Sequence, residues 1–171
     1  PISYSTLRIQ DLKIPKHVLV VGCLDNGIAR RAVAAMAENY CYWIDAGNGL
    51  DLGQVLVGNS DTITFDQTTN TITEIPIPSL QRPEILLQAP LTPTIVNCAE
   101  LPEQGPTINQ FMAALVVETV QRLITGTCPW FQLLLDLKNM SMQPTMADPS
   151  ILRKMYKGKF EIKANKKWRD K

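Results

Sequence analysis

The sequence lacks the signatures of several common enzyme classes. It contains no GxGxxG, no GxxxxGK[ST] and no HExxH pattern, which are the motifs of dinucleotide, P-loop and zinc-protease sites. Histidine occurs once, as His17, which argues against a Ser-His-Asp or Cys-His hydrolase. No apolar run approaches the roughly 20 residues of a membrane span, and the N-terminal residues do not have the pattern of a signal peptide. We therefore expect a cytoplasmic protein without a membrane partner.

Cysteine is also scarce, and the four residues of this type are Cys23, Cys41, Cys98 and Cys128. No two of them form a CxxC pair, so the spacing of a structural zinc site is absent. Reduced thiols are the simplest prediction for a cytoplasmic protein. Cys23 lies within a predicted buried strand, and we expect it to be a small, inert residue there.

Charge is nearly balanced over the whole chain, at +1, but it is unevenly distributed. Residues 150–171 hold nine basic and two acidic residues, giving +7, whereas the rest of the chain holds eight and 14, giving −6. A basic segment on an acidic body favours an acidic partner, which is nucleic acid, another protein or a second copy. The alternative is a solvated terminal extension.

Hydrophobic patterning in the first half predicts an α/β domain. The 171 residues, 45% of them hydrophobic, suffice for one domain with a core. An apolar run at 18–24, a helical pattern at 26–39 and a strand at 42–46 predict a strand–helix–strand unit. Because continuous apolar runs are typical of parallel strands, we expect the first strand to be covered on both faces. Further strands are predicted at 53–58, 62–66 and 130–137, with a loop or hairpin tip at 68–73.

Proline and helix signals organise the second half. Seven of the twelve prolines fall in residues 76–106, which excludes long helices and central strands there. Residues 107–125 carry apolar side chains at helical spacing between Pro106 and Gly126, which predicts a helix. Its apolar stripe is wide, so we expect it to be nearly buried, in the core or in a dimer interface.

Polar residues stand where the first strand gives way to the helix. Asp25 and Asn26 follow the apolar run, and Arg30 and Arg31 lie on the helix. Ligands of open α/β sheets bind outside the carboxyl ends of strands, and a helix N-terminus favours anions. Asp25 is either a helix cap or a carboxylate that holds Mg²⁺ against phosphates. We expect Arg30 to face the cleft and Arg31 to point to solvent.

A second strand end brings Asp45, Gly47 and Asn48, and Gly53-Gln54 follows. Glycines at these positions either let a bound chain or nucleotide approach the backbone closely or serve a β-turn with positive φ. The sequence favours neither alternative.

These residues resemble a known family. The stretch GCLDNGIARRAVAAMAENYCYWIDAGNGLDLGQVLVG is similar to the middle of the ThiF/MoeB/ubiquitin-activating-enzyme superfamily, in particular to plasmid-associated ThiF-like proteins of bacteria. The shared pattern is an apolar strand ending in Asp25-Asn26, then Arg30, a helix, a strand at 42–46, and Gly53-Gln54 before a further strand. GPTINQFMAALVVETVQRLITG resembles the long helix after that family's crossover loop, and FQLLLDLKNMSMQP resembles its following strand pair. The resemblance covers residues 15–145.

The resemblance implies an activity and a site. Members use MgATP to adenylate the C-terminal carboxylate of a ubiquitin-like or sulfur-carrier protein. By position, Asp25 corresponds to the aspartate that serves Mg²⁺ and the ATP phosphates, and Asn26 and Arg30 to neighbours that shape this site. A metal and guanidinium groups would offset the repulsion between the attacking carboxylate and the α-phosphate. Cys98, in VNCAELPEQGP, lies where some members keep a cysteine for thioester or persulfide chemistry, which needs an exposed thiolate.

The resemblance also implies a missing part. The family's Gly-rich nucleotide loop and several charged residues precede the Asp-Asn strand, and only 17 residues precede Val18 here. We therefore expect a Rossmann-like, mostly parallel sheet with an antiparallel C-terminal portion, incomplete because the N-terminal Gly-rich βαβ half is absent. Residues 1–149 would be the C-terminal part of the domain and 150–171 a basic extension. The absent half would belong to a longer chain, to a separate polypeptide or to a lost nucleotide function, and this chain alone would not bind ATP tightly.

Two other functions stay open at this point. A non-catalytic scaffold with the same fold would form a homodimer and recruit a partner through its cleft or its basic segment. A nucleic-acid-associated protein would use residues 150–171, where Tyr156, Phe160 and Trp168 stand among lysines. Such side chains suit base stacking combined with phosphate contacts.

Overall fold

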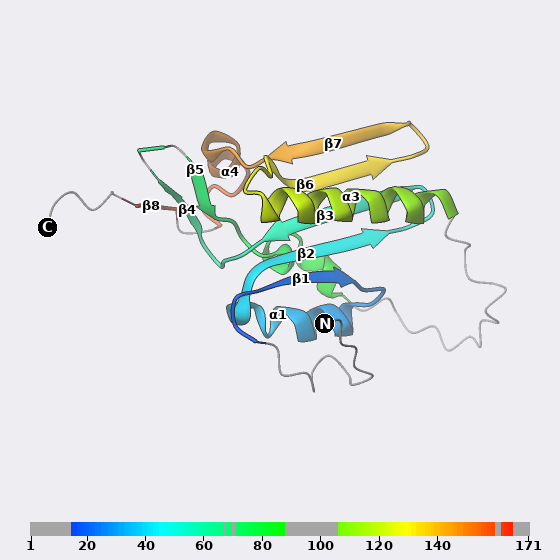
Figure 1. The fold of residues 1–171 in the computed structure, drawn as a ribbon, viewed down its shortest axis with the longest axis horizontal. Coiled ribbons are helices and arrows are strands. Elements are labelled where there is room, and N and C mark those ends of the chain that lie inside the picture. The colour runs from blue at the N-terminus through cyan, green and yellow to red at the C-terminus, as the bar shows by residue number, and fades with distance from the viewer. Residues whose placement is uncertain (1–14, 67, 70, 88–105, 160–161, 166–171) are drawn as a thin grey trace, which may run out of the picture.

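The chain forms two β-sheets with helices packed around them (Figure 1). A computed structural model describes residues 15–66, 68–69, 71–87, 106–159 and 162–165. The larger sheet has five strands in the order β1-β2-β3-β6-β7, and the smaller has three in the order β5-β4-β8. The prediction of an α/β fold is confirmed at this coarse level.

The larger sheet is mostly antiparallel, so the prediction of a mostly parallel sheet is wrong. Its strands are β1 (Val18–Cys23), β2 (Tyr40–Asn48), β3 (Leu52–Gly58), β6 (Trp130–Asp136) and β7 (Ser141–Met146). Among these strands only β1 and β2 pair in parallel, and the other three pairs are antiparallel. For the strand pairs that are consecutive along the chain, the reason is the length of the connections. A helix crosses from β1 to β2, whereas short turns join β2 to β3 and β6 to β7 and reverse the chain.

The crossover between β1 and β2 contains two short helices, α1 (Gly27–Ala34) and the 3₁₀-helix η2 (Ala37–Asn39). A single helix over 26–39 was predicted, and the α-helix ends earlier than that. After Ala35 the chain tightens into η2 and turns into β2, where the Tyr40 hydroxyl donates to the carbonyl of Val33 at 3.0 Å. The strand–helix–strand unit itself is confirmed.

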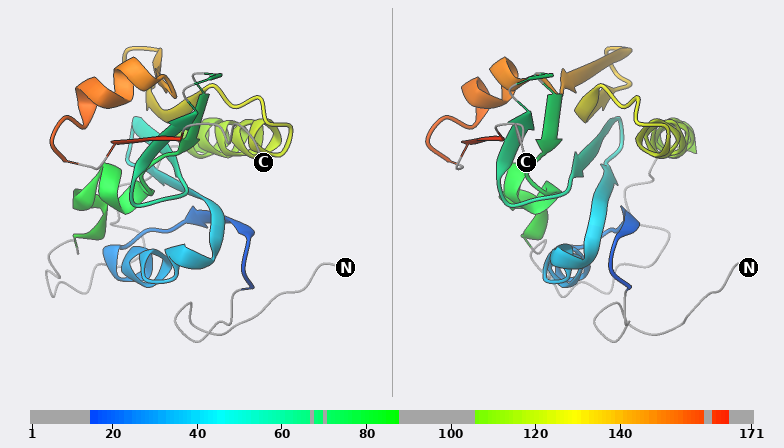
Figure 2. Two further views of the ribbon diagram at one scale, coloured as in Figure 1. Left: turned by 90° about the vertical axis from the view of Figure 1, so that its left-hand side faces the viewer. Right: turned by 60° about the vertical axis from the view of Figure 1, so that its left-hand side comes forward.

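Helix α3 (Pro106–Ile124) matches the helix predicted at 107–125. It covers one face of β2, β3 and β6, and α1 packs on the opposite face, which gives three layers (Figure 2). The α3 side of the core is built from apolar side chains, among them Ile44, Val55, Ile108, Met112 and Leu133. The outer side of α3 is not covered by described residues, because Val117 and Ile124 are 65% and 74% exposed. The prediction that this helix is nearly buried in the core is therefore wrong for the described residues, and burial in a dimer interface stays a prediction.

The two outer strands of the larger sheet differ from expectation. β1 lies at one edge, and its Val21 side chain is 41% exposed. Cys23 is also exposed. The predictions that β1 is covered on both faces and that Cys23 is buried are therefore wrong. Val18 and Val20 pack on the α1 side of the sheet, whereas Val21 and Cys23 point to the opposite face and stay exposed. β7 lies at the other edge and contains an exposed Pro144.

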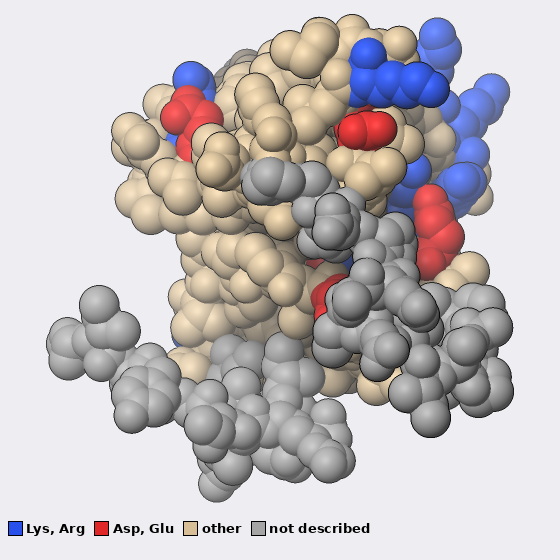
Figure 3. All heavy atoms as spheres, turned by 90° about the vertical axis from the view of Figure 1, so that its right-hand side faces the viewer, with Lys and Arg blue, Asp and Glu red and all other residues tan. Residues whose placement is uncertain are grey.

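The smaller sheet joins the end of the chain to its middle. It consists of β4 (Ile63–Asp66), β5 (Thr71–Glu74) and β8 (Ile162–Asn165), and β8 pairs in parallel with β4. Helix α4 (Pro149–Met155) packs beside it, and Leu152 is fully buried with Ile63 and Phe131. Figure 3 shows lysine and arginine side chains gathered on one side of the molecule. Residues 150–159 and 162–165 of the basic segment thus include elements of the fold.

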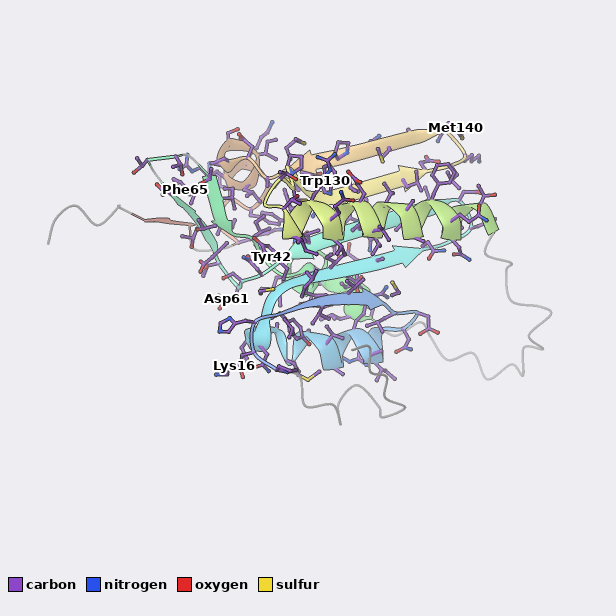
Figure 4. The ribbon with its side chains drawn as sticks, viewed as in Figure 1. Lys16, Tyr42, Asp61, Phe65, Trp130 and Met140 are labelled. Carbon is purple, nitrogen blue, oxygen red and sulfur yellow. The ribbon has the colours of Figure 1, made fainter. Side chains whose placement is uncertain are left out.

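The proline-rich segment begins with two short helices, α2 (Pro78–Gln81) and the 3₁₀-helix η3 (Pro83–Leu86). Over residues 76–87 this agrees with the exclusion of long helices and central strands, and residues 88–105 of the segment lie outside the described residues. Elsewhere, Trp130 at the start of β6 donates from Nε1 to Thr119 of α3 at 3.4 Å, and Met140 lies at the tip of the β6–β7 hairpin (Figure 4). None of the described helices is long and apolar enough to cross a membrane.

Candidate functional site

A cavity of about 990 Å³ opens where β1 and β2 end. One wall comes from the residues that follow β1, another from the end of β2 and the start of β3, and a third from α3. The described polar residues that line it are Asp25, Arg30, Asn48, Gln54, Arg82, Asn109, Asp136, Ser141 and Gln143. A concave site with a few converging polar groups is the usual form of a ligand-binding site. Two of the four residues predicted for the site, Asp25 and Arg30, are therefore brought to one cavity.

Asp25 and Asn26 have separate tasks at the start of α1. Asn26 is the N-cap, and its Oδ1 accepts from the backbone N–H of Ala29 at 2.8 Å. Its Nδ2 donates to Asp25 Oδ1 at 2.7 Å. The sequence offered Asp25 as a cap or as a ligand-binding carboxylate, and the cap is supplied by its neighbour. Asp25 is exposed and lines the cavity with its position fixed on one side by Asn26.

The first turn of α1 is covered by η3. The carbonyl oxygens of Leu86 and Leu87 occupy the space that a side chain at Gly27 would need. Arg31, which was predicted to point to solvent, is exposed but also donates from Nη1 to the Leu86 carbonyl. Protein atoms and not a ligand therefore cover this side of the helix start, and a larger residue than glycine would separate α1 from η3.

Arg30 and Asp45 form a buried ion pair beside the cavity. Arg30 Nε lies 3.1 Å and 3.0 Å from the two Asp45 oxygens, and the side chains are 11% and 0% exposed. Arg30 Nη2 also donates to the Ala46 carbonyl at 3.4 Å. Burial raises the pKa of Asp45 to about 6, although the charge and hydrogen bond of Arg30 act in the opposite direction. Arg30 therefore lines the cavity with its charge already balanced, a partnership that the sequence did not reveal.

The glycines near the cavity serve packing. A Cβ at Gly47 would lie 3.1 Å from Arg30 Nη2, and a Cβ at Gly53 would collide with the sulfur of Met112 on α3. Among the described glycines, positive φ occurs at Gly126 and Gly158, so Gly47 and Gly53 are not turn residues of that kind. These glycines therefore do not serve a turn with positive φ. The atoms that come close to them belong to Arg30 and Met112 of the protein itself.

The opposite wall is contributed by α3. Asn48 at the end of β2 donates from Nδ2 to Asn109 Oδ1 at 2.8 Å, which ties the first turn of α3 to the sheet. Met112 and Val116 follow along the same helix and give this wall an apolar surface. The cavity therefore combines charged groups at the β1–α1 junction with an apolar side.

Arg82 is a lining residue that the sequence did not single out. It lies between α2 and η3, and its side chain is 35% exposed. Its ion-pair partner among the described residues is Glu84, at 3.5 Å and with a side chain 58% exposed. No local signal marks Arg82, because its position at the cavity depends on how the proline-rich segment folds back over the sheet.

The residues at the cavity suit one mode of magnesium binding and not another. No group of three or more His, Cys, Asp or Glu side chains among the described residues is arranged to hold a metal ion. Mg²⁺ is commonly held by one or two carboxylates together with substrate phosphates and water. Asp25, an exposed carboxylate at the cavity, fits that shared mode, whereas an all-protein magnesium cage does not fit.

No protein-family model matches this chain, and no curated protein matches it. The family resemblance thus stays a prediction, and function must be argued from the site. Cys98, the fourth residue predicted for the site, lies outside the described residues. The described residues that flank its segment are Leu87, next to Gly27 of α1, and Pro106, the first residue of α3.

Proposed function

We propose that this chain acts in the ATP-dependent adenylation of the C-terminal carboxylate of a ubiquitin-like or sulfur-carrier protein, and that it supplies the magnesium and phosphate side of the site. The observation that carries the proposal is the cavity at the ends of the parallel pair β1 and β2, where Asp25 and Arg30 line one space. This is the edge of an α/β sheet at which ligands bind.

The order of elements supports the proposal. An apolar strand leads to Asp25-Asn26, followed by a helix, a second strand, an antiparallel strand that contains Gly53-Gln54, a long helix and a hairpin. The resemblance implies the same order. Fold order alone does not specify chemistry, so the proposal rests on the cavity residues as well.

The reaction requires two anions to meet. A carboxylate oxygen attacks the α-phosphorus of ATP, a new oxygen–phosphorus bond forms, and the bond to pyrophosphate breaks. Asp25 would hold Mg²⁺, which when bound neutralises phosphate charge. Arg30, tied to Asp45 and to the Ala46 carbonyl, is a positioning residue that fixes α1 and thereby the junction carrying Asp25. In a later step the Cys98 thiolate would attack the carbonyl of the acyl-adenylate, forming a thioester and releasing AMP.

The described residues support the scaffold alternative more than the nucleic-acid alternative. Phe111 and Ile124 of α3 are exposed apolar residues that do not line the cavity, which is in line with the scaffold alternative and with a homodimer. The nucleic-acid alternative loses one of its stacking side chains, because Tyr156 is 4% exposed and its hydroxyl accepts from Gln132.

ATP–pyrophosphate exchange tests the proposal. The complete gene product is assayed with a candidate carrier protein, and Asp25→Ala is expected to reduce exchange at least about 100-fold, as expected for the loss of electrostatic stabilisation of the reacting phosphate. Asp61→Ala, an exposed aspartate on the β3–β4 turn away from the cavity, is the control and should retain exchange. Full exchange in the Asp25→Ala variant contradicts the assignment, and absence of ATP binding by the wild type favours the scaffold.

A further inference from the structure

Two guanidinium groups line the cavity, and they differ in how closely each is paired with a carboxylate. Arg30 is 11% exposed and lies 3.0 Å from the buried carboxylate of Asp45. Arg82 is 35% exposed, and the carboxylate nearest to it, that of Glu84, is 3.5 Å away at the surface. A surface ion pair of this kind contributes little. The positive charge that the cavity can offer to a ligand is therefore that of Arg82.

The backbone at Arg82 is fixed by contacts that do not involve its side chain. The preceding residue, Gln81, donates from Nε2 to the carbonyls of Val57 at 2.7 Å and Pro76 at 2.6 Å. Gln132 of β6 donates to Gln81 Oε1 at 3.0 Å. The N–H of Arg82 donates to the Pro78 carbonyl at 3.0 Å. A charged group on a preorganised backbone binds its ligand without first having to order the chain.

The floor of the cavity offers hydrogen bonds beside this cation. Gln54 of β3 is opposite Leu134 of β6, which is in turn opposite Gln143 of β7. All three line the cavity, and neither glutamine side chain is hydrogen-bonded to another described residue. Carboxamides donate hydrogen bonds to oxyanions without adding charge. The uncharged side chains of Gln54 and Gln143, which can donate hydrogen bonds, thus lie in the same cavity as Arg82.

We propose that Arg82 is the oxyanion-binding residue of this cavity, and that it binds a carboxylate or phosphate of an incoming substrate above Gln54 and Gln143. The planar guanidinium can donate two parallel hydrogen bonds to either group. The identity of the substrate that carries the oxyanion rests on the proposed function, whereas the binding itself does not require turnover. Arg82 is thereby a specificity residue, separate from Asp25 and from the Arg30–Asp45 pair.

Binding of two small probes tests this inference. Pyrophosphate represents the phosphate source, and N-acetyl-diglycine represents the carboxylate of a polypeptide terminus. Both are titrated into the 171-residue chain while the arginine Nε–Hε resonances are followed by NMR. Arg82→Gln is expected to weaken the binding of at least one probe about 10-fold or more, because it removes the charge from the hydrogen bonds to the oxyanion. Arg82→Lys should weaken probe binding by a smaller factor than Arg82→Gln. Lysine keeps the positive charge but cannot donate two parallel hydrogen bonds from one planar group.

The control is Arg122→Gln, which removes an arginine of similar exposure on α3 that does not line the cavity. A loss confined to pyrophosphate assigns the oxyanion to a nucleotide, and a loss confined to N-acetyl-diglycine assigns it to a polypeptide. Equal binding of both probes by wild type and Arg82→Gln overturns the inference, as does a wild type that binds neither. Failure of ATP–pyrophosphate exchange with normal probe binding would instead contradict the proposed function alone.

Discussion

Arg30 of α1 lies against Asp45 of β2, with its Nε within 3.1 Å of both carboxylate oxygens. The pair connects the crossover helix to the sheet next to the cavity, and one of its members is fully buried. A buried pair of this kind is not a source of large net stability, but each member becomes costly to the fold when the other is removed.

We predict strong coupling between these two residues. Asp45→Ala should lower the free energy of unfolding by about 1–3 kcal/mol, because it leaves the buried Arg30 Nε–H without the two oxygens that accept from it. In the double variant with Arg30→Met, the loss should be at least about 1 kcal/mol smaller than the sum of the two single losses. Urea unfolding of all four proteins measures the cycle. Additive losses would show that the two side chains do not stabilise each other.

The same pair predicts a dependence of stability on pH. Burial raises the pKa of Asp45 from its ordinary 3.8 to about 6, so between these pH values the folded state binds more protons at this site than the unfolded state. The contribution of Asp45 is therefore fully present below about pH 4 and is lost as pH rises through about 6, by up to about 3 kcal/mol.

Urea unfolding at several pH values from 4 to 7 checks this sign. The difference in unfolding free energy between wild type and Asp45→Asn should shrink as pH rises, because the variant has no carboxyl at this position to titrate. A difference that grows with pH would mean that Arg30 lowers the pKa of Asp45 by more than burial raises it.

Gly53 should be sensitive to the addition of a single methyl group. A Cβ there would collide with the sulfur of Met112, so Gly53→Ala should destabilise the protein by about 1–3 kcal/mol through overpacking. Gly49→Ala is the matched control, since no described atom lies within 4 Å of its Cβ position, and should change stability by less than about 0.5 kcal/mol. Combining Gly53→Ala with Met112→Ala should cost less than the sum of the single changes.

Leu152 tests whether the basic segment belongs to the fold. Its side chain is fully buried against Ile63 and Phe131, so Leu152→Ala should reduce the unfolding free energy by about 2–5 kcal/mol. Lys154→Ala, an exposed change on the same helix, should have an effect below about 0.5 kcal/mol. Similar small effects in both variants would indicate that α4 is dispensable for stability.

Local patterns predicted the elements well where all the signals agreed. Helix α3 has apolar spacing, Pro106 at its start and Gly126 beyond its end, and it is found within one residue of the prediction. Local patterns could not predict neighbours. The apolar run of β1 was assigned to a covered parallel strand, yet its position at the edge depends on the rest of the sheet. The pairing of β4 with β8 joins residues about 100 positions apart, and no sequence period reports it.

The site was predicted in part for the same reason. Asp25 follows a strand directly, so its place at the strand end could be inferred from the chain alone. The partner of Arg30 could not, because Asp45 comes 15 residues later and meets it only when α1 packs on β2. Arg82 comes to the cavity through a fold-back that depends on the hydrogen bonds of Gln81, which are themselves contacts between distant segments.

The two outer strands of the larger sheet also set a limit on self-association. Pro144 in β7 has no N–H to offer to an added strand, and proline at an edge is a known protection against such pairing. β1 contains neither proline nor a charged residue along Val18–Cys23. A filament built by joining sheets needs two edges that can pair, and this sheet has one. Strand pairing between copies through the described edges of the larger sheet would therefore stop at two, closing a symmetric dimer and leaving no free edge of that sheet from which a fibre could grow.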